Sequence, residues 1–148
     1  MSTLLAILVS GIVATTAMTT FLCLIDKSGR VNANMARALG SALTRSIETS
    51  LLPGLIIQYL AGLFFALVYI YALSRLQIVS LFSYLVGGGI IGFAHGFVFS
   101  FIMVILAEHH PVEEFQNASF QVAIVHFLSH IIYGLFIGLV GGLILLSN

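Results

Sequence analysis

The chain has 148 residues, of which 60% are hydrophobic and 7% are charged, whereas about 25% of the residues in a soluble domain carry charge. Five basic and five acidic residues give a formal net charge of zero, and the basic patch expected of a nucleic-acid-binding protein is missing. This composition excludes a soluble domain and a nucleic-acid partner. It predicts an integral membrane protein whose first partner is the lipid bilayer.

Four long apolar stretches contain none of the formally charged residues, and they cover residues 4–25, 51–73, 81–107 and 120–146. Each exceeds the roughly 20 residues that an α-helix needs to cross about 30 Å of hydrocarbon. We therefore predict an all-α membrane protein, a single domain over residues 1–148 that forms an antiparallel bundle of four transmembrane helices. The first stretch lacks the basic n-region of a secretory signal, so we expect a retained first span.

The connection between the first two spans carries most of the basic residues, which are Lys27, Arg30, Arg37 and Arg45. The positive-inside rule places this loop, residues 26–50, in the cytoplasm and both termini outside. By parity, the loop of residues 108–119 is cytoplasmic as well.

Apolar residues recur at helical spacing within the first loop, over residues 31–47. Met35, Leu39 and Leu43 belong to this apolar arc, while Arg37 falls on the opposite one. The pattern predicts a short amphipathic helix that lies in the membrane interface. We expect a connector whose apolar face avoids water, and the alternative is an element that docks a partner or senses lipids.

Two pairs of segments resemble each other within the chain. Residues 61–68 align without gaps with residues 133–140, and residues 11–14 resemble residues 89–92. The second and fourth spans, and more weakly the first and third, are therefore candidates for repeats. Two duplicated helical hairpins of the same orientation would be related by an axis along the membrane normal.

Small residues recur every four positions on the third and fourth spans. The rows are Gly88, Gly92, Gly96 and Ser100 on the third span, and Gly134, Gly138 and Gly142 on the fourth. In lipid the hydrophobic effect gives little drive for helix association, so close backbone approach through small residues replaces it. These rows predict a glycine-rich contact between the helices.

Three histidines lie on or beside the glycine rows. His126 and His130 continue the row of the fourth span, and His95 lies beside the row of the third. At 1.5 Å per residue, His95 and His130 each lie roughly 18 Å from the loop ends of their helices. We therefore expect these two side chains at the same depth, with His126 one turn nearer the loop.

Polar groups at this depth are costly and call for an explanation. In a structural role, each ring would donate to a backbone carbonyl or bond with a nearby side chain, namely Gln58, Ser100, Ser129 or Tyr133. In a ligating role, the neutral imidazoles of His95, His126 and His130 would bind haem b or a transition metal. In a relay role, they would carry protons along a transport path. No bound cofactor is the default expectation.

A second polar cluster lies at the membrane surface, where Glu108, His109 and His110 precede Pro111. Carboxylate and imidazole together can bind a divalent ion, so Glu108 and His109 are candidate ligands. Because proline disfavours helical geometry in the residue before it, the adjacent histidines are poorly arranged to share a metal. We expect a solvated acidic turn that is too far from His95 to form one site with it.

Residues 11–19, together with residues 130–134 and the following Gly138, resemble a family of small prokaryotic four-span membrane proteins of unknown function. The resemblance covers most of the chain. It implies a four-helix topology and a prokaryotic inner membrane, and it implies no substrate, cofactor or catalytic residue.

No recognisable set of nucleophile, base and acid occurs, and the spans contain no Asp or Glu. We therefore expect a small non-catalytic membrane protein, an accessory or stabilising subunit that associates with other membrane subunits or with itself. The first alternative is a haem- or metal-binding protein that serves electron transfer through His95, His126 and His130. The second is a small transporter with a histidine proton relay.

Overall fold

The computed structural model describes residues 2–147, and this part of the chain contains helices and loops only. A single 3-10 turn, Glu113–Phe115, lies in the last loop. The α-helices are α1 (Ser2–Lys27), α2 (Met35–Thr44), α3 (Leu51–Arg75), α4 (Leu81–Ala107) and α5 (Phe120–Leu146).

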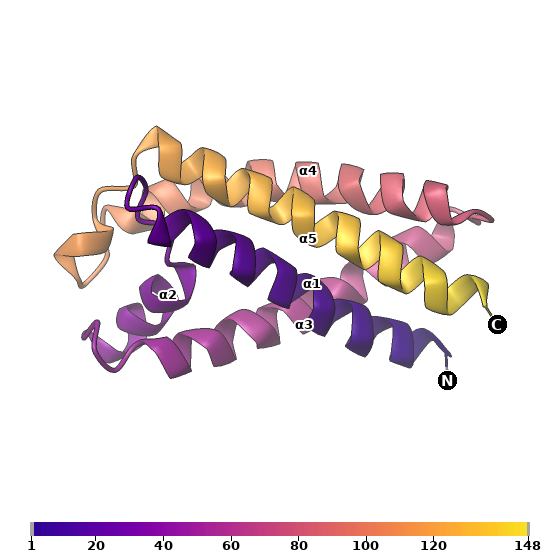
Figure 1. Cartoon of the computed structure of the whole chain (residues 1–148), viewed down its shortest axis with the longest axis horizontal. Coiled ribbons are helices and arrows are strands. Elements are labelled where there is room, and N and C mark those ends of the chain that lie inside the picture. Colours follow the sequence, from indigo (N-terminus) through magenta and orange to yellow (C-terminus); the bar gives the residue numbers. More distant parts are fainter. Residues whose placement is uncertain (1, 148) are drawn as a thin grey trace.

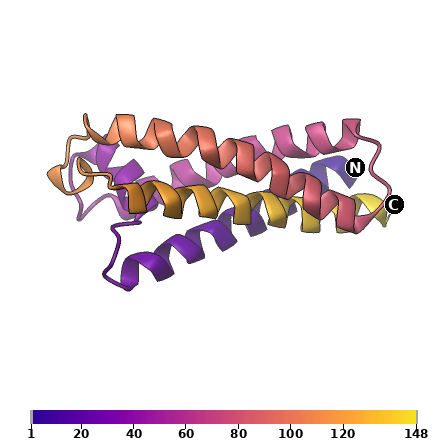
Figure 2. The same ribbon diagram turned by 90° about the horizontal axis from the view of Figure 1, so that it is seen from above.

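The four long helices form an antiparallel bundle (Figure 1). Helices α1 and α4 run in one direction along the long axis and α3 and α5 in the other, and both ends of the chain lie at the same end (Figures 1 and 2). Each of the four is long and apolar enough to cross a membrane. The prediction of an all-helical bundle is confirmed, and the four helices indicate an integral membrane protein in contact with lipid.

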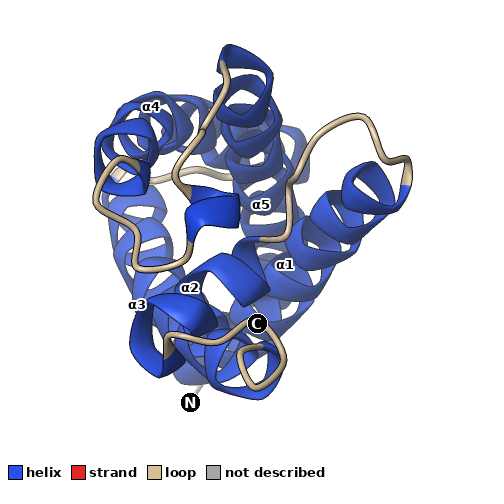
Figure 3. Ribbon diagram, turned by 90° about the vertical axis from the view of Figure 1, so that its left-hand side faces the viewer, coloured by secondary structure: helices blue, strands red, loops and turns tan. Residues whose placement is uncertain are grey.

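The bundle has two different ends. We call the end that carries α2 and the loop between α4 and α5 the loop end, and the opposite one the terminal end. Seen from the loop end, α2 and that loop lie across the bundle (Figure 3). Helices α4 and α5 start at serine caps, because Ser80 accepts from the Ser83 amide at 3.1 Å and Ser119 accepts from the Val122 amide at 3.3 Å.

Helix α2 is shorter than the predicted amphipathic segment of residues 31–47. The Asn34 side chain caps its start by accepting from the Arg37 amide at 3.1 Å. Arg45 ends it, because this residue adopts a left-handed conformation with φ of 55°. Helix α2 contacts the start of α3 at Gly40. A Cβ added to Gly40 would collide with the carbonyl group of Ser50, so a larger residue does not fit at this position. Leu43, on the predicted apolar arc, is 70% exposed.

Helix α5 is central to the packing, with α4 on one side and α1 on the other. Glycines form its contact with α4. A Cβ added to Gly92 would lie 2.6 Å from the His130 carbonyl oxygen, so only glycine permits this approach. Helix α1 packs more extensively on α5 than on α3, its own hairpin partner. The duplication of the two hairpins stays a prediction from the sequence.

The terminal end of the bundle is filled by side chains, whereas the loop end keeps cavities. Tyr69 and Ile70 of α3 are at most 1% exposed and belong to one core cluster with Tyr133 and Ile137 of α5, which are at most 2% exposed. Leu73 of α3 is also fully buried. Helices α3 and α4 make few contacts with each other. The space between them, on the loop side of Tyr69, is where the candidate site lies.

Candidate functional site

A cavity of about 160 Å³ lies inside the bundle, lined mainly by α3, α4 and α5 and also by residues of α1 and α2, and we call it the inner cavity. Its walls are mainly apolar, with aromatic rings from Phe65 of α3 and Phe99 of α4. A few polar side chains interrupt this lining, and they are Gln58, His95, His126, Ser129, His130 and Tyr133. Mostly apolar walls with a few convergent polar groups are typical of small-molecule sites.

His95 projects from α4 into a group of rings. Its ring centroid lies 4.2 Å from that of Phe65, 4.5 Å from that of Phe99 and 4.7 Å from that of His130. The Nδ1 atom is hydrogen-bonded to the Tyr69 hydroxyl at 2.9 Å. The Nε2 atom is buried and has no hydrogen-bond partner among residues 2–147. His95 therefore presents one unused polar atom to its surroundings.

His130 and His126 follow each other by one helical turn on α5. The Nδ1 of His130 lies 2.7 Å from the His126 carbonyl oxygen, and a carbonyl can only accept, so His130 carries its proton on Nδ1. A neutral His130 ring then keeps a lone pair on Nε2. The side chain of His126 is 4% exposed, and its Nδ1 has no partner within the described chain.

Gln58 completes the set of unpartnered groups on the cavity wall. Its amide nitrogen donates to the Thr19 hydroxyl at 2.9 Å, but its buried Oε1 has no partner in the described structure. Leaving a buried polar group without a hydrogen bond costs roughly 1–3 kcal/mol. Because Gln58, His95 and His126 all line the inner cavity, a molecule within it that can both donate and accept would recover part of this cost.

The inner cavity is open on its side between α3 and α4. Ala61 of α3 lines the cavity and is also exposed on the bundle surface. Because the two helices have few contacts and the surface here belongs to membrane-spanning segments, this opening faces lipid. Phe65 and Phe99 are in ring contact at this side, with centroids 5.4 Å apart, so a molecule that enters the inner cavity from the bilayer has to displace these two rings.

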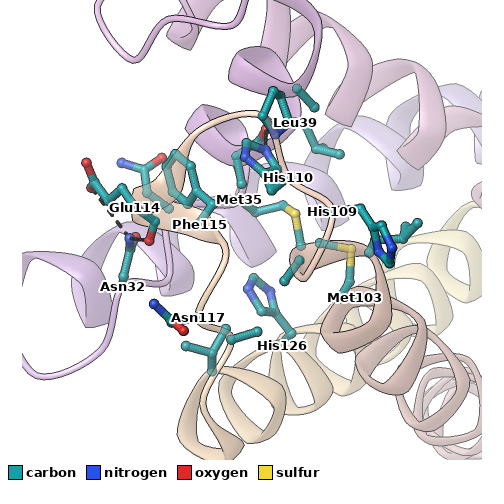
Figure 4. Close-up of a pocket in the computed structure, with 18 residues that line it drawn as sticks. Asn32, Met35, Leu39, Met103, His109, His110, Glu114, Phe115, Asn117 and His126 are labelled. Carbon is teal, nitrogen blue, oxygen red and sulfur yellow. Dashed lines mark hydrogen bonds between the residues drawn. The ribbon is translucent and has the colours of Figure 1, made fainter.

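A second cavity of about 310 Å³ lies at the loop end, and we call it the loop cavity. It is bounded by α2, the loop ends of α4 and α5, and the loop between them (Figure 4). Its polar lining comes from Asn32, Asn34, His109, His110, Glu114, Asn117 and His126. In Figure 4 the His126 side chain points from α5 into this space, beside Met103 and Asn117.

His110 ties the loop to α2. Its Nε2 lies 2.9 Å from the Ala38 carbonyl oxygen and therefore donates, while its Nδ1 accepts from the Val112 amide at 3.1 Å. Both ring nitrogens are thus used within the protein. Glu108 and His109, the predicted ligands of a divalent ion, are exposed, and His109 borders the loop cavity.

The structure brings some of the predicted site residues together and not others. His95 and His130 are in ring contact, and His126 is one turn nearer the loop end. Among residues 2–147, no group of three or more His, Cys, Asp or Glu side chains is placed to hold a metal ion. The surface cluster was predicted to be too far from His95 to form one site with it, and His95 does not line the loop cavity. His126, one turn nearer the loop end, lines this cavity together with His109 and His110. The reason is that α2 and the loop fold over the end of α5.

The expected side-chain partners of the histidine rings are not the ones that the structure shows. Ser100, Ser129 and Tyr133 donate instead to the backbone carbonyls of Gly96, His126 and Gly62. Tyr69 bonds His95, and sequence reasoning missed it. A signal was available, because the hydroxyl of a tyrosine in the middle of an apolar span usually requires a hydrogen-bond partner.

Comparison of the chain with known protein families, with curated proteins and with solved structures finds no match. The functional argument therefore rests on the geometry of the two cavities.

Proposed function

We propose that this protein is a small non-catalytic membrane protein that binds a lipid-soluble molecule in the inner cavity through a hydrogen-bonding head group. The observation that carries the proposal is the presence of two unpartnered atoms, Gln58 Oε1 and His95 Nε2, on the wall of an apolar cavity that opens toward lipid. Apolar walls supply affinity for such a molecule, and the few polar atoms fix its orientation.

The size of the cavity limits the head group. An apolar cavity of about 150 Å³ holds benzene, and the inner cavity has about 160 Å³. One ring therefore fits, and the aromatic side chains of Phe65 and Phe99 border it on two helices. Any longer apolar part of the molecule would extend between α3 and α4 into the bilayer. The ligand class that fits is a single-ring head group with carbonyl or hydroxyl substituents on a hydrocarbon chain.

The test is native mass spectrometry of the protein released from its own membrane in mild detergent. We expect an adduct of one organic molecule on the wild-type chain. The variants Gln58→Leu and His95→Phe keep side-chain volume but remove the polar atoms, so the adduct should fall at least tenfold. Tyr59→Phe is the control, because Tyr59 bonds Thr16 away from the cavity. A wild-type chain without an adduct, or an adduct that both cavity variants retain, contradicts the proposal.

The role as an accessory or stabilising subunit is part of the proposal. Its support is the apolar side chains that α4 exposes to the outside, such as Phe93, Phe97 and Phe101. Lipid covers such a surface in a membrane protein that stands alone, whereas in the proposed role another membrane subunit or a second copy of the chain covers it. Purification from native membranes should therefore yield the protein together with a partner, and a chain that purifies alone as a monomer counts against this role.

The haem alternative has little geometric support. Two imidazoles on opposite sides of one metal, each nitrogen about 2 Å away, have ring centroids about 6 Å apart. The centroids of His95 and His130 are 4.7 Å apart with the rings at 65°, so no macrocycle fits between them. A visible spectrum and elemental analysis of the purified protein test for haem and for a transition metal.

The proton-relay alternative requires a path across the whole membrane. Such a path would have to pass Tyr69 and Tyr133, which are at most 2% exposed.

We also propose that the loop end faces the cytoplasm of a prokaryotic inner membrane. Four of the five basic residues belong to the loop end, and Arg75 alone lies at the terminal end; the resemblance to small prokaryotic four-span proteins supports the choice of membrane. A periplasmic reporter enzyme fused after residue 148 should be active. If the same reporter is active only when it is inserted in the loop of residues 108–119, the protein has the opposite orientation and the proposal is wrong.

A further inference from the structure

The two cavities are neighbours, because the same four side chains line both of them. These shared side chains are Met35 and Leu39 of α2, Met103 of α4 and His126 of α5. The loop cavity lies on the outer side of this group and the inner cavity on the side of His95. These four side chains therefore form the shared wall of the two cavities.

The shared wall is polar at one position and adaptable at two others. His126 is 4% exposed, and its Nδ1 is buried without a partner in the described chain. Methionine is unbranched with three rotatable bonds, so Met35 and Met103 can change rotamer at low cost. Two side chains of this wall can therefore move aside, and its one polar ring has a buried nitrogen without a hydrogen-bond partner in the described chain.

We propose that the loop cavity and the inner cavity form one water-filled path, from the loop end of the bundle to the depth of His95, with His126 at the narrowest point. One water molecule needs about 10–15 Å³ of cavity volume and at least two polar partners. The volumes of about 310 Å³ and 160 Å³ hold several waters. The unpartnered Gln58 Oε1, His95 Nε2 and His126 Nδ1 are the groups that such waters satisfy.

The path ends inside the membrane. Beyond Tyr69 and Tyr133, the fully buried side chains of Ile70, Leu73 and Ile137 fill the terminal end. Water reaches the site from one side only. This inference goes beyond the proposed ligand binding and does not depend on it. It describes the protein with an unoccupied inner cavity, because a bound single-ring head group would fill the cavity of about 160 Å³ and displace the water there.

Cysteine accessibility tests the path with depth-matched controls. Cys23, the only cysteine, is first replaced by alanine. Single cysteines are then placed at Met103, which lines both cavities, and at Phe99, one turn deeper on the inner cavity. The controls are Ile102→Cys and Val98→Cys, whose positions face outward at the same depths and line neither cavity. The probe is a membrane-impermeant, positively charged methanethiosulfonate.

Only an ionised thiol reacts readily, and ionisation requires water. We expect the probe, added at the loop side of the membrane, to modify Met103→Cys and Phe99→Cys at least tenfold faster than the two controls. Equal rates at path and control positions overturn the proposal. So does modification of Phe99→Cys from the terminal side. Adding His126→Phe should slow the modification at Phe99→Cys tenfold or more, and an unchanged rate overturns the role of His126.

A measurement on the unmodified chain covers the case in which Phe99→Cys does not fold. Magnetisation transfer from water to the ring protons of His126 and His130, recorded by solid-state NMR in bilayers, should be strong. The ring protons of Phe93, which is 56% exposed on the lipid side, provide the dry reference. If magnetisation transfer from water to the two histidine rings is as weak as transfer to the Phe93 ring, the path is not hydrated and the proposal is wrong.

Discussion

Gly88 of α4 and Gly134 of α5 exclude a side chain at each other's positions. A Cβ added to Gly88 would collide with the carbonyl oxygen of Gly134, and a Cβ added to Gly134 would collide with the carbonyl oxygen of Gly88. The two backbones are therefore in direct contact. This contact fixes α4 on α5, and with it the depth of His95 relative to His130.

A single methyl group at this contact should destabilise the bundle. In Gly88→Ala the new methyl group would collide with the backbone of α5, which can move only if the whole helix shifts. We therefore expect the free energy of unfolding to fall by roughly 1–3 kcal/mol. The neighbouring Gly89→Ala is the control, because its Cβ would lie 2.9 Å from Leu135 Cδ2, the flexible end of a side chain. Thermal unfolding in detergent measures both. Equal melting temperatures for the two variants would show that the glycine contact does not hold the helices together.

The tie between α2 and the last loop should depend on His110 and not on His109. His110→Ala removes the bonds to the Ala38 carbonyl and the Val112 amide, at a cost of about 1 kcal/mol per bond. We expect faster hydrogen exchange in residues 108–119 and at the start of α2. His109→Ala changes an exposed side chain and should leave exchange as in the wild type. Identical exchange patterns in the two variants contradict the tie.

The hydrogen bonds assign opposite tautomers to two histidines. His130 donates from Nδ1 to the His126 carbonyl, whereas His110 donates from Nε2 to the Ala38 carbonyl. The ¹⁵N chemical shifts of the rings, measured near neutral pH, should show a protonated Nδ1 for His130 and a protonated Nε2 for His110. Finding His130 protonated on Nε2 alone would mean that its bond to α5 does not form.

Substitutions of the two residues that form the hydrogen bond between Gln58 and Thr19 should lower the free energy of unfolding by different amounts. Thr19→Val leaves the buried Gln58 amide without its acceptor, so we expect a loss of roughly 1–3 kcal/mol. Gln58→Leu removes the donor together with the unpartnered Oε1, and the Thr19 hydroxyl still donates to the Thr15 carbonyl. We therefore expect Gln58→Leu to lower the free energy of unfolding by less than about 1 kcal/mol. Unfolding in mixed micelles gives both values, and the reverse order would contradict the assigned bond.

Part of this protein follows from the sequence alone. The absence of charge over stretches of more than 20 residues predicts four membrane-spanning helices, because a continuous helix forms all its backbone hydrogen bonds within one apolar segment. The glycine rows predict which faces of α4 and α5 meet, since Gly92 and Gly134 permit an approach that larger residues prevent. The equal depth expected for His95 and His130 follows from helix rise, and the structure places the two rings in contact.

The two cavities were decided by the tertiary structure. An apolar face can pack on a neighbouring helix or on lipid at nearly equal free energy, so hydropathy does not show that α3 and α4 separate around the inner cavity. Nor does it show that Tyr69 bonds His95, or that α2 places Met35 in the same cavity walls as His126. These relationships depend on how surfaces from distant segments fit together. Local spacing determines the helices and their small-residue faces, whereas the fit of five helices determines where polar groups remain without partners.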